Sequence, residues 1–264
     1  MFDLAMLSDV GARRANNEDA CGHWAETPGE IVIAIADGVG GAAGGEVASR
    51  LAVDVTLAAY RASPPGLGAA RRLARAAQEA NLAIYNQAFA TPGVGRMATT
   101  MTAAAVTGGV LSVVHAGDCR LYLLRHGGVR QLTRDHNLAG ERARMRLLSA
   151  EAARQHRDRA VLTRSLGREL IASLDRVMLP LVPGDQLLLC SDGLYTALED
   201  RELGALCRGR GALAACRRLI EAADRRGTTD NLTAVVLTVF DDAPAASGVW
   251  HWGTRLRSLL TFAD

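Results

Sequence analysis

The sequence contains no lysine, so all 30 of its basic residues are arginine. Together with the abundance of alanine, this bias indicates a GC-rich coding sequence more than a selected surface chemistry. Against 28 acidic residues the formal net charge is only +2, and no arginine-rich stretch is interleaved with aromatic residues. Charge therefore gives no argument for nucleic-acid binding, and we expect no nucleic-acid partner.

Paired cysteines and long apolar runs are also lacking. The five cysteines form no Cys-x-x-Cys motif and are odd in number, so we expect reduced core residues: Cys21, Cys119, Cys190, Cys207 and Cys216. No apolar run approaches the ~18 residues of a membrane span, and no charged start followed by an apolar block indicates a signal peptide. The sequence therefore predicts a cytoplasmic protein without a transmembrane segment.

Apolar residues make up 49% of the 264 residues, which is enough for a sizeable core. Predicted strands gather in the clusters 99–132, 175–190 and 232–240, and predicted helices pair as 46–60 with 69–90 and 200–207 with 211–226. This order differs from the strand–helix alternation of parallel-sheet proteins. On the helix at 69–90 we expect Arg71, Arg72 and Arg75 to form a solvated face.

The most informative stretch runs from Glu30 to Glu46. Its apolar, β-branched residues Ile31–Ala36 predict a buried strand that ends on Asp37 and is followed by five glycines within eight residues. A carboxylate there is costly unless a cation or several donors meet it, and glycines let backbone atoms approach closely. These features are typical of an oxygen-ligand metal site. Two alternatives are a glycine-rich turn in which Asp37 caps the next helix, and a dinucleotide-binding loop, which lacks the acidic residue expected about 20 positions later.

Acidic residues recur at the ends of predicted strands: Asp37, Asp118, Asp192 and Asp230. Glu18 and Asp19 lie in a polar loop that also carries Arg13 and Arg14. No His-x-x-x-His pattern accompanies these acids, so the ions they would hold are Mg²⁺ or Mn²⁺ before Zn²⁺. Two ions sharing a carboxylate would bind and deprotonate a water for hydrolysis, and Arg14 would hold a substrate phosphate.

Six segments in this order resemble the motifs of the PPM (protein phosphatase 2C-like) metal-dependent serine/threonine phosphatases, bacterial branch: SDVGARRANNED, ADGVGGAAGGEVAS, GDCRLY, LTRDHNL, CSDGL and GTTDNLTAVV. The resemblance spans about Ala5 to Val239. It implies an α+β fold, a four-layer α-β-β-α sandwich of two antiparallel sheets flanked by helix pairs. The clustered strands and paired helices support that architecture.

The resemblance also assigns roles to the acids. Asp37 would bridge two tightly bound Mn²⁺ or Mg²⁺ ions, and the carbonyl of Gly38 would ligate one of them. Asp192 and Asp230 would complete the other site. Asp118, together with Asp192, would hold a weaker third ion.

Around these ligands, Arg14 would bind the phosphoryl group, and Glu18 and Asp19 would act through metal-bound waters. Residues 133–168 would form a mobile flap beside the active site. Family members of the eukaryotic type carry a histidine, proposed as general acid, where this chain has Val39. A metal-bound water is then the first candidate for the acid, and the flap histidines His136 and His156 are the second.

The implied activity is hydrolysis of phosphoserine and phosphothreonine in proteins, which would reverse serine/threonine kinase signalling. The alternatives are a silent pseudophosphatase that binds phosphoproteins and a nucleotide-binding regulator using the glycine-rich loop. We expect a monomer with a catalytic domain at 1–240. Within the tail, 241–264, the segment Val249–Phe262 has helical spacing of apolar residues and is expected to dock on the catalytic domain. The alternatives are a flexible tail and a docking helix for a partner or an anionic membrane surface.

Overall fold

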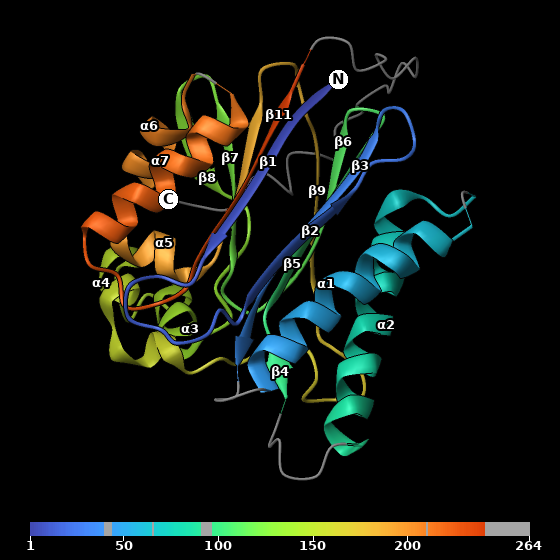
Figure 1. Cartoon of the computed structure of the whole chain (residues 1–264), viewed down its shortest axis with the longest axis horizontal. Coiled ribbons are helices and arrows are strands. Elements are labelled where there is room, and N and C mark those ends of the chain that lie inside the picture. Colours follow the sequence, from blue (N-terminus) through green and yellow to red (C-terminus); the bar gives the residue numbers. More distant parts are fainter. Residues whose placement is uncertain (40–43, 65, 91–96, 210, 241–264) are drawn as a thin grey trace.

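Two antiparallel β-sheets face each other across the middle of the protein, and helices cover their outer faces (Figure 1). The computed structural model describes residues 1–39, 44–64, 66–90, 97–209 and 211–240. The first sheet has the strand order β1 (Phe2–Asp9), β11 (Leu232–Val239), β10 (Gln186–Cys190), β7 (Arg120–Arg125), β8 (Gly128–Gln131). The predicted four-layer α+β architecture is thereby confirmed.

The second sheet has the order β2 (Asp19–Trp24), β3 (Glu30–Val39), β5 (Met101–Thr107), β6 (Val110–Ala116), β9 (Asp175–Pro180), and the short β4 (Ala98–Thr99) pairs with β3. The pairing of β3 with both β2 and β5 is antiparallel. A dinucleotide-binding loop requires a parallel βαβ unit, so the pairing excludes that alternative.

The unbroken apolar run of β3 is explained by burial on both of its faces. Ile31, Ile33 and Ile35 belong to the core between the two sheets, which also contains Leu187 and Val235 of the first sheet. The intervening residues at 32, 34 and 36 belong to the core beneath the helices. A strand buried on both faces carries apolar residues at every position, as this one does.

Helices α1 (Gly44–Ala62) and α2 (Ala69–Ala90) cover the second sheet, and α5 (Asp192–Ala197), α6 (Asp200–Cys207) and α7 (Ala212–Arg225) cover the first (Figure 1). Three further short helices lie in residues 133–168, which we call the flap: α3 (Leu138–Arg144), α4 (Ala150–Gln155) and the 3₁₀ turn η1 (Arg157–Ala160). Among the described helices, none combines the length and the apolarity needed to cross a membrane.

The helices predicted at 69–90 and 200–207 have these bounds in the structure, and strands β7 and β10 lie within the predicted strand clusters 99–132 and 175–190. The strand predicted to end on Asp37 is two residues longer in the structure, because Gly38 and Val39 continue it by pairing with Thr99 and Ala98. Strand β2 and helix α5 were not predicted. In β2, a Cβ at Gly22 would lie 2.7 Å from a methyl group of Val53, so glycine lets helix α1 rest on this edge strand.

One prediction about α2 was wrong. Arg72 is buried, 8% exposed, and does not join a solvated face. Its Nη1 donates to Glu30 Oε1 at 2.8 Å, and its guanidinium stacks over the ring of Tyr60 at 4.0 Å. The buried Glu30 carboxylate needs a cation, and the nearest turn of α2 supplies it.

The cysteines agree with the prediction of a reduced core. All five are free, and four of them are buried, whereas Cys21 is partly exposed. The predicted tail helix at 249–262 lies outside the described residues.

Candidate active site

Carboxylates from both sheets gather at one end of the sandwich. Asp19 and Asp37 are direct cross-strand partners on β2 and β3. Asp118 lies between β6 and β7, Asp192 is the first residue of α5, and Asp230 precedes β11. The charges of the other four acids all act on Asp37. The structure thus brings together the acids that the sequence singled out, although their roles as ligands stay predictions.

The backbone of Asp37 is fixed by hydrogen bonds to two threonines. Its amide donates to Thr100 Oγ1 at 2.8 Å, and its carbonyl accepts from the Thr100 amide at 2.8 Å and from Thr99 Oγ1 at 2.8 Å. Thr99 ends β4, and Thr100 lies in the break between β4 and β5. Burial, followed by repulsion from Asp19, raises the pKa of Asp37 well above its usual range.

Asp19 joins the two sheets at this end. Its Oδ2 accepts from Ser191 Oγ at 2.6 Å and from Thr233 Oγ1 at 2.7 Å. Ser191 directly follows β10, and Thr233 lies in β11, both strands of the first sheet. Burial raises the pKa of Asp19 to about 7 in spite of these two donors. The hydroxyls therefore orient the carboxylate without fully replacing the water that it has lost.

Asp192 and Asp230 each engage an arginine. Arg159 Nη1 of η1 donates to Asp192 Oδ2 at 2.8 Å, and Arg14 Nη2 donates to Asp230 Oδ2 at 2.9 Å. Burial and then repulsion from Asp230 raise the pKa of Asp192, while Arg159 opposes this rise. A Cβ at Gly193 would lie 2.1 Å from the carbonyl oxygen of Asn231, so glycine there allows α5 to approach the Asp230 segment.

Asn231 organises the loop that carries Arg14. Its Oδ1 accepts from the Glu18 amide at 2.9 Å, and its Nδ2 donates to the carbonyls of Val10 at 2.9 Å and Asn16 at 3.0 Å. Sequence analysis missed this positioning role. The only sequence signal for this role of Asn231 was that its side-chain amide directly follows Asp230 in the chain.

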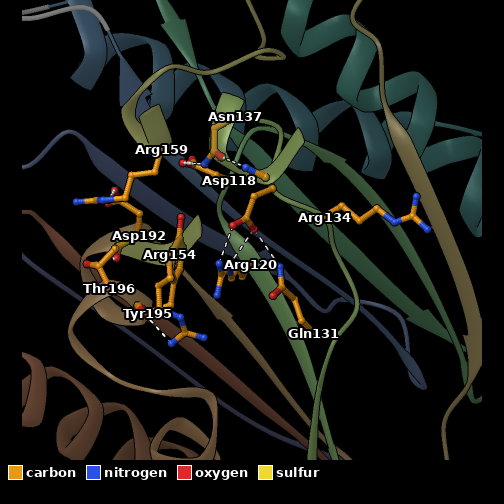
Figure 2. Close-up of polar contacts among 12 residues, drawn as sticks. Asp118, Arg120, Gln131, Arg134, Asn137, Arg154, Arg159, Asp192, Tyr195 and Thr196 are labelled. Atoms are coloured by element: carbon orange, nitrogen blue, oxygen red, sulfur yellow. Dashed lines mark hydrogen bonds and ion pairs between the residues drawn. The ribbon is translucent and has the colours of Figure 1, made fainter. Parts of the chain in front are cut away.

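Asp118 is only 6% exposed and is oriented from the flap. Asn137 Nδ2 donates to its Oδ2 at 3.0 Å (Figure 2). Burial, followed by repulsion from Asp192, raises the pKa of Asp118 to about 8. The predicted position of the flap beside the acids is therefore observed, while its mobility stays a prediction.

Glu18 and Gly38 meet at a close backbone approach. The Gly38 amide donates to the Glu18 carbonyl at 3.0 Å, and a Cβ at Gly38 would lie 2.2 Å from the carbonyl oxygen of Gly45. A Cβ at Gly45 would in turn lie 2.7 Å from Glu18 Oε2. Only glycines permit this packing, which explains part of the glycine-rich sequence. Burial raises the pKa of Glu18 as well, against the attraction of Arg14.

The donor chemistry of this site fits divalent cations that prefer oxygen. Several buried carboxylates repel one another, and this repulsion adds to burial in raising the pKa values of Asp37, Asp118 and Asp19. Hydroxyls donate to Asp19, and an amide donates to Asp118. Two arginines donate to Asp192 and Asp230. Among the residues that the structure covers, no three acidic, histidine or cysteine side chains already form a ligand set. A divalent ion held here would compete with the two arginines for the carboxylates of Asp192 and Asp230.

The two flap histidines considered as general acids are both engaged. His136 is 3% exposed, its Nδ1 accepts from the Gly117 amide at 3.2 Å, and its Nε2 lies 3.1 Å from Asp175 Oδ2. Burial lowers the pKa of His136. His156 Nδ1 accepts from the Asp158 amide at 3.2 Å. Both ring nitrogens of His136 are thus engaged, which disfavours it as the general acid, whereas His156 is engaged through Nδ1. Water stays the first candidate for the acid.

Comparison with known proteins identifies this arrangement. The family profile described as Protein phosphatase 2C matches residues 11–236, which include all of the acids above. The chain belongs to the protein phosphatase 2C family. The predicted resemblance is thus confirmed.

Members of the family with high similarity are bacterial serine/threonine phosphatases. The chain is 37% identical over 238 residues to serine/threonine protein phosphatase PstP of Mycobacterium tuberculosis, covering 90% of this chain and 45% of that protein. It therefore spans about half the length of this relative. It is 32% identical over 234 residues to serine/threonine phosphatase stp of Listeria monocytogenes, covering 87% of this chain and 93% of that protein.

A solved structure of the family carries metal. The catalytic domain of PstP in complex with two manganese ions aligns with a TM-score of 0.80 and 35% identity, covering 91% of this chain and 99% of that one. The manganese ions belong to that protein, and they agree with the oxygen-rich donor chemistry found here.

Proposed function

We propose that this chain hydrolyses phosphoserine and phosphothreonine in proteins, with Mn²⁺ or Mg²⁺ bound at the gathered carboxylates. The observation that carries the proposal is the convergence of five aspartates at one end of the sandwich, where burial and mutual repulsion raise the pKa of Asp37 well above its usual range. A cluster of this kind is stable in its ionised form only with added cations. Relatives named serine/threonine phosphatases support the reaction class.

Within this proposal, Asp37, the Gly38 carbonyl, Asp192 and Asp230 would hold two ions, and Asp118 would contribute to a weaker third site. Bound there, the ions would supply an activated water and neutralise charge on the phosphoryl group. Glu18 and Asp19 would act in the outer shell of ligands. The Ser191 and Thr233 hydroxyls support this role for Asp19, because they fix its orientation.

Arg14 takes the part of the phosphoryl-binding residue. Its side chain is about half exposed and is held by Asp230 at 2.9 Å and by the Thr229 carbonyl at 3.3 Å. If a cation were bound at Asp230, the fork of the Arg14 guanidinium would be available for two phosphoryl oxygens. Arg14 would then orient the phosphoryl group for in-line attack.

We further propose that the substrates are phosphoproteins made by a serine/threonine kinase, and that the enzyme acts as a cytoplasmic monomer. The free cysteines support a reducing compartment. The names of the relatives support the substrate class.

The test is release of phosphate from a phosphothreonine peptide by the purified chain with Mn²⁺ and with excess chelator. Turnover with Mn²⁺ and none with chelator supports the proposal. Tight peptide binding without turnover at any Mn²⁺ concentration would show a pseudophosphatase and refute it. Binding of a nucleotide in equilibrium dialysis, with no turnover of the peptide, would refute it in favour of a nucleotide-binding regulator.

A further inference from the structure

The residues that begin the flap lie against the link that carries Asp118. We call residues 135–137 the clamp, because each of them contacts a residue of 117–120, which joins β6 to β7. The pairs are Asp135 with Arg120, His136 with Gly117, and Asn137 with Asp118. Three consecutive contacts fix the link along its length, so the position of Asp118 depends on the clamp.

Asn137 uses the two ends of one side-chain amide for two different tasks. Its Nδ2 donates to Asp118 Oδ2 at 3.0 Å (Figure 2), and its Oδ1 accepts from the Gly140 amide at 2.8 Å, which caps the N-terminus of α3. The backbone amide can only donate and an ionised carboxylate can only accept, so the Asn137 amide has one productive orientation. The helix cap therefore sets the direction of the donor that Asp118 meets.

His136 fixes the backbone immediately before Asp118. Its amide donates to the Gly117 carbonyl at 2.8 Å, and the Gly117 amide donates back to His136 Nδ1 at 3.2 Å. Because Nδ1 accepts, the ring proton of a neutral imidazole lies on Nε2, which faces Asp175 Oδ2 at 3.1 Å. The ring also stacks on His115, with 4.7 Å between the centroids. This buried histidine thus holds both backbone groups of Gly117 and is itself held on its far side.

Gly117 connects the same link to the support of Asp37. It has a φ of +110°, and a Cβ there would lie 2.5 Å from the Cβ of Thr100. Thr100 Oγ1 accepts from the Asp37 amide at 2.8 Å. Only glycine fits at this approach. The backbone that leads into Asp118 therefore contacts the clamp as well as the threonine that fixes Asp37.

Asp118 differs from the neighbouring acids in the charge of its partner. Asp192 and Asp230 each accept from an arginine, whereas Asp118 accepts from the neutral amide of Asn137. A neutral donor orients an ionised carboxylate and leaves its negative charge available to a cation. Replacing a group that orients a metal ligand from outside the ligand shell typically weakens metal binding by about 10- to 100-fold.

Resting on the proposed function, we propose that His136 and Asn137 are positioning residues that hold Asp118 for the weak third ion, and that the amide of Asn137 sets the affinity of that site. Neither residue touches the substrate in this role. The two tight ions assigned to Asp37, Asp192 and Asp230 should not depend on the clamp.

Two substitutions of Asn137 separate its two tasks. Asn137→Ser keeps a helix cap, because a serine hydroxyl accepts from an amide of the first turn, but its side chain is too short to reach Asp118. Asn137→Ala loses both the cap and the donor. Ser149→Ala is the matched control, since Ser149 caps α4 in the same flap by accepting from the Ala152 amide at 3.0 Å. A general loosening of the flap would appear in Ser149→Ala, whereas loss of the Asp118 contact would not.

The first measurement is titration of the metal-free full chain with Mn²⁺, followed by electron paramagnetic resonance of the free ion. Asn137→Ser should bind two tight ions as the wild type does and raise the Kd of the third ion about tenfold. Ser149→Ala should match the wild type. The proposal is overturned by an unchanged third Kd in Asn137→Ser, by an equal rise in Ser149→Ala, by loss of the tight ions, or by a wild type that binds no third ion.

The second measurement follows turnover of a phosphothreonine peptide as the Mn²⁺ concentration is raised. Asn137→Ser should need about tenfold more Mn²⁺ for half-maximal kcat, with most of kcat recovered at saturation and KM for the peptide unchanged. His136→Asn, whose Oδ1 can replace Nδ1 as the acceptor for Gly117, should need less Mn²⁺ than His136→Phe. A raised KM with an unchanged Mn²⁺ requirement would show contact with the substrate and refute the positioning role.

The third measurement is thermal unfolding in excess chelator, which examines the contact without any ion. Asn137→Ser should lower Tm by about 2–4 °C when Asp118 is present, as expected for one buried hydrogen bond. In the Asp118→Ala background the same substitution should change Tm little, because nothing remains for Nδ2 to hold. Equal losses in the two backgrounds would show that Asn137 acts on the flap alone and would overturn the proposal.

These measurements separate the inference from the function on which it rests. If the wild type shows no turnover with Mn²⁺, the proposed function fails, whereas Mn²⁺ binding and unfolding still decide whether Asn137 holds Asp118 for an ion. If the wild type turns over normally and Asn137→Ser matches Ser149→Ala throughout, the proposed function stands and the inference about the clamp falls.

Discussion

Replacement of Asp118 by asparagine should stabilise the cation-free protein while it impairs turnover. Asp118 is 6% exposed, and burial followed by repulsion from Asp192 raises its pKa from 3.8 to about 8. Because the pKa is higher in the folded state, the unfolded chain releases this proton at lower pH than the folded protein does. The carboxyl therefore costs no stability below pH 3.8 and destabilises the folded state increasingly as the pH rises from 3.8 to about 8.

The size of the effect follows from the same shift. Each pKa unit corresponds to about 1.4 kcal/mol, so the shift from 3.8 to about 8 sets an upper bound of about 6 kcal/mol near pH 8. Neighbouring carboxyls share protons and relax, so we expect about 1–2 kcal/mol at neutral pH, or a rise in Tm of about 2–8 °C. Asparagine can still accept the bond from Asn137 that Asp118 now accepts at 3.0 Å.

Thermal unfolding in excess chelator, at about pH 5.5 and about pH 7.5, tests this reasoning. Asp118→Asn should melt above the wild type, with the larger difference at the higher pH. Asp54→Asn, at an exposed acid on α1, is the matched control and should leave Tm unchanged at both pH values. A variant that melts below the wild type at both pH values would refute the account of Asp118. The Mn²⁺-loaded variant should keep two tight ions but turn over slowly, because Asp118 is assigned to the third ion alone.

Two further predictions concern arginines. Arg14→Ala should raise KM for a phosphopeptide more than it lowers kcat, by the ~1.5–3 kcal/mol of a charge-assisted contact. Steady-state kinetics of the exposed neighbour Arg13→Ala provide the control, and a larger effect there would show that the two positions were assigned in the wrong order. Arg72→Ala should leave the Glu30 carboxylate buried without its cation and destabilise the fold by ~3–5 kcal/mol, seen in denaturant unfolding. Arg71→Ala, on the exposed face of the same helix, should change stability little, and similar losses in both variants would exclude a special role for the buried pair.

The elements of the fold that were predicted well are those with local signals. The apolar run before Asp37, the alanine-rich helix at 69–90 and the strand cluster at 175–190 are visible in hydrophobic pattern alone, and the structure has strands or a helix at or near these bounds. Strand β2 was missed because Gly22 and His23 weaken its pattern. Its place at the sheet edge depends on α1, whose side chains fill the space that a Cβ at Gly22 would take.

The site was predictable to the extent that acids beside glycines stand out in a sequence. Their supporting contacts were not predictable, because each joins residues far apart in the chain. Asp19 accepts from Ser191 and Thr233, which lie 172 and 214 residues away. The contact of Arg159 with Asp192 likewise depends on the path of the flap. Pattern along one sequence carries no information on such pairings.

The most direct test of the central claim is to count bound Mn²⁺ by calorimetry and to measure phosphopeptide turnover on the same samples of wild type and Asp37→Asn. The account predicts two tightly bound ions and turnover in the wild type, both abolished by excess chelator. Asp37→Asn should stay folded, lose tight binding and keep less than about a tenth of kcat, a loss of at least ~1.4 kcal/mol in the barrier. Turnover that survives chelator, or an Asp37→Asn variant that keeps both ions and full turnover, would contradict the account.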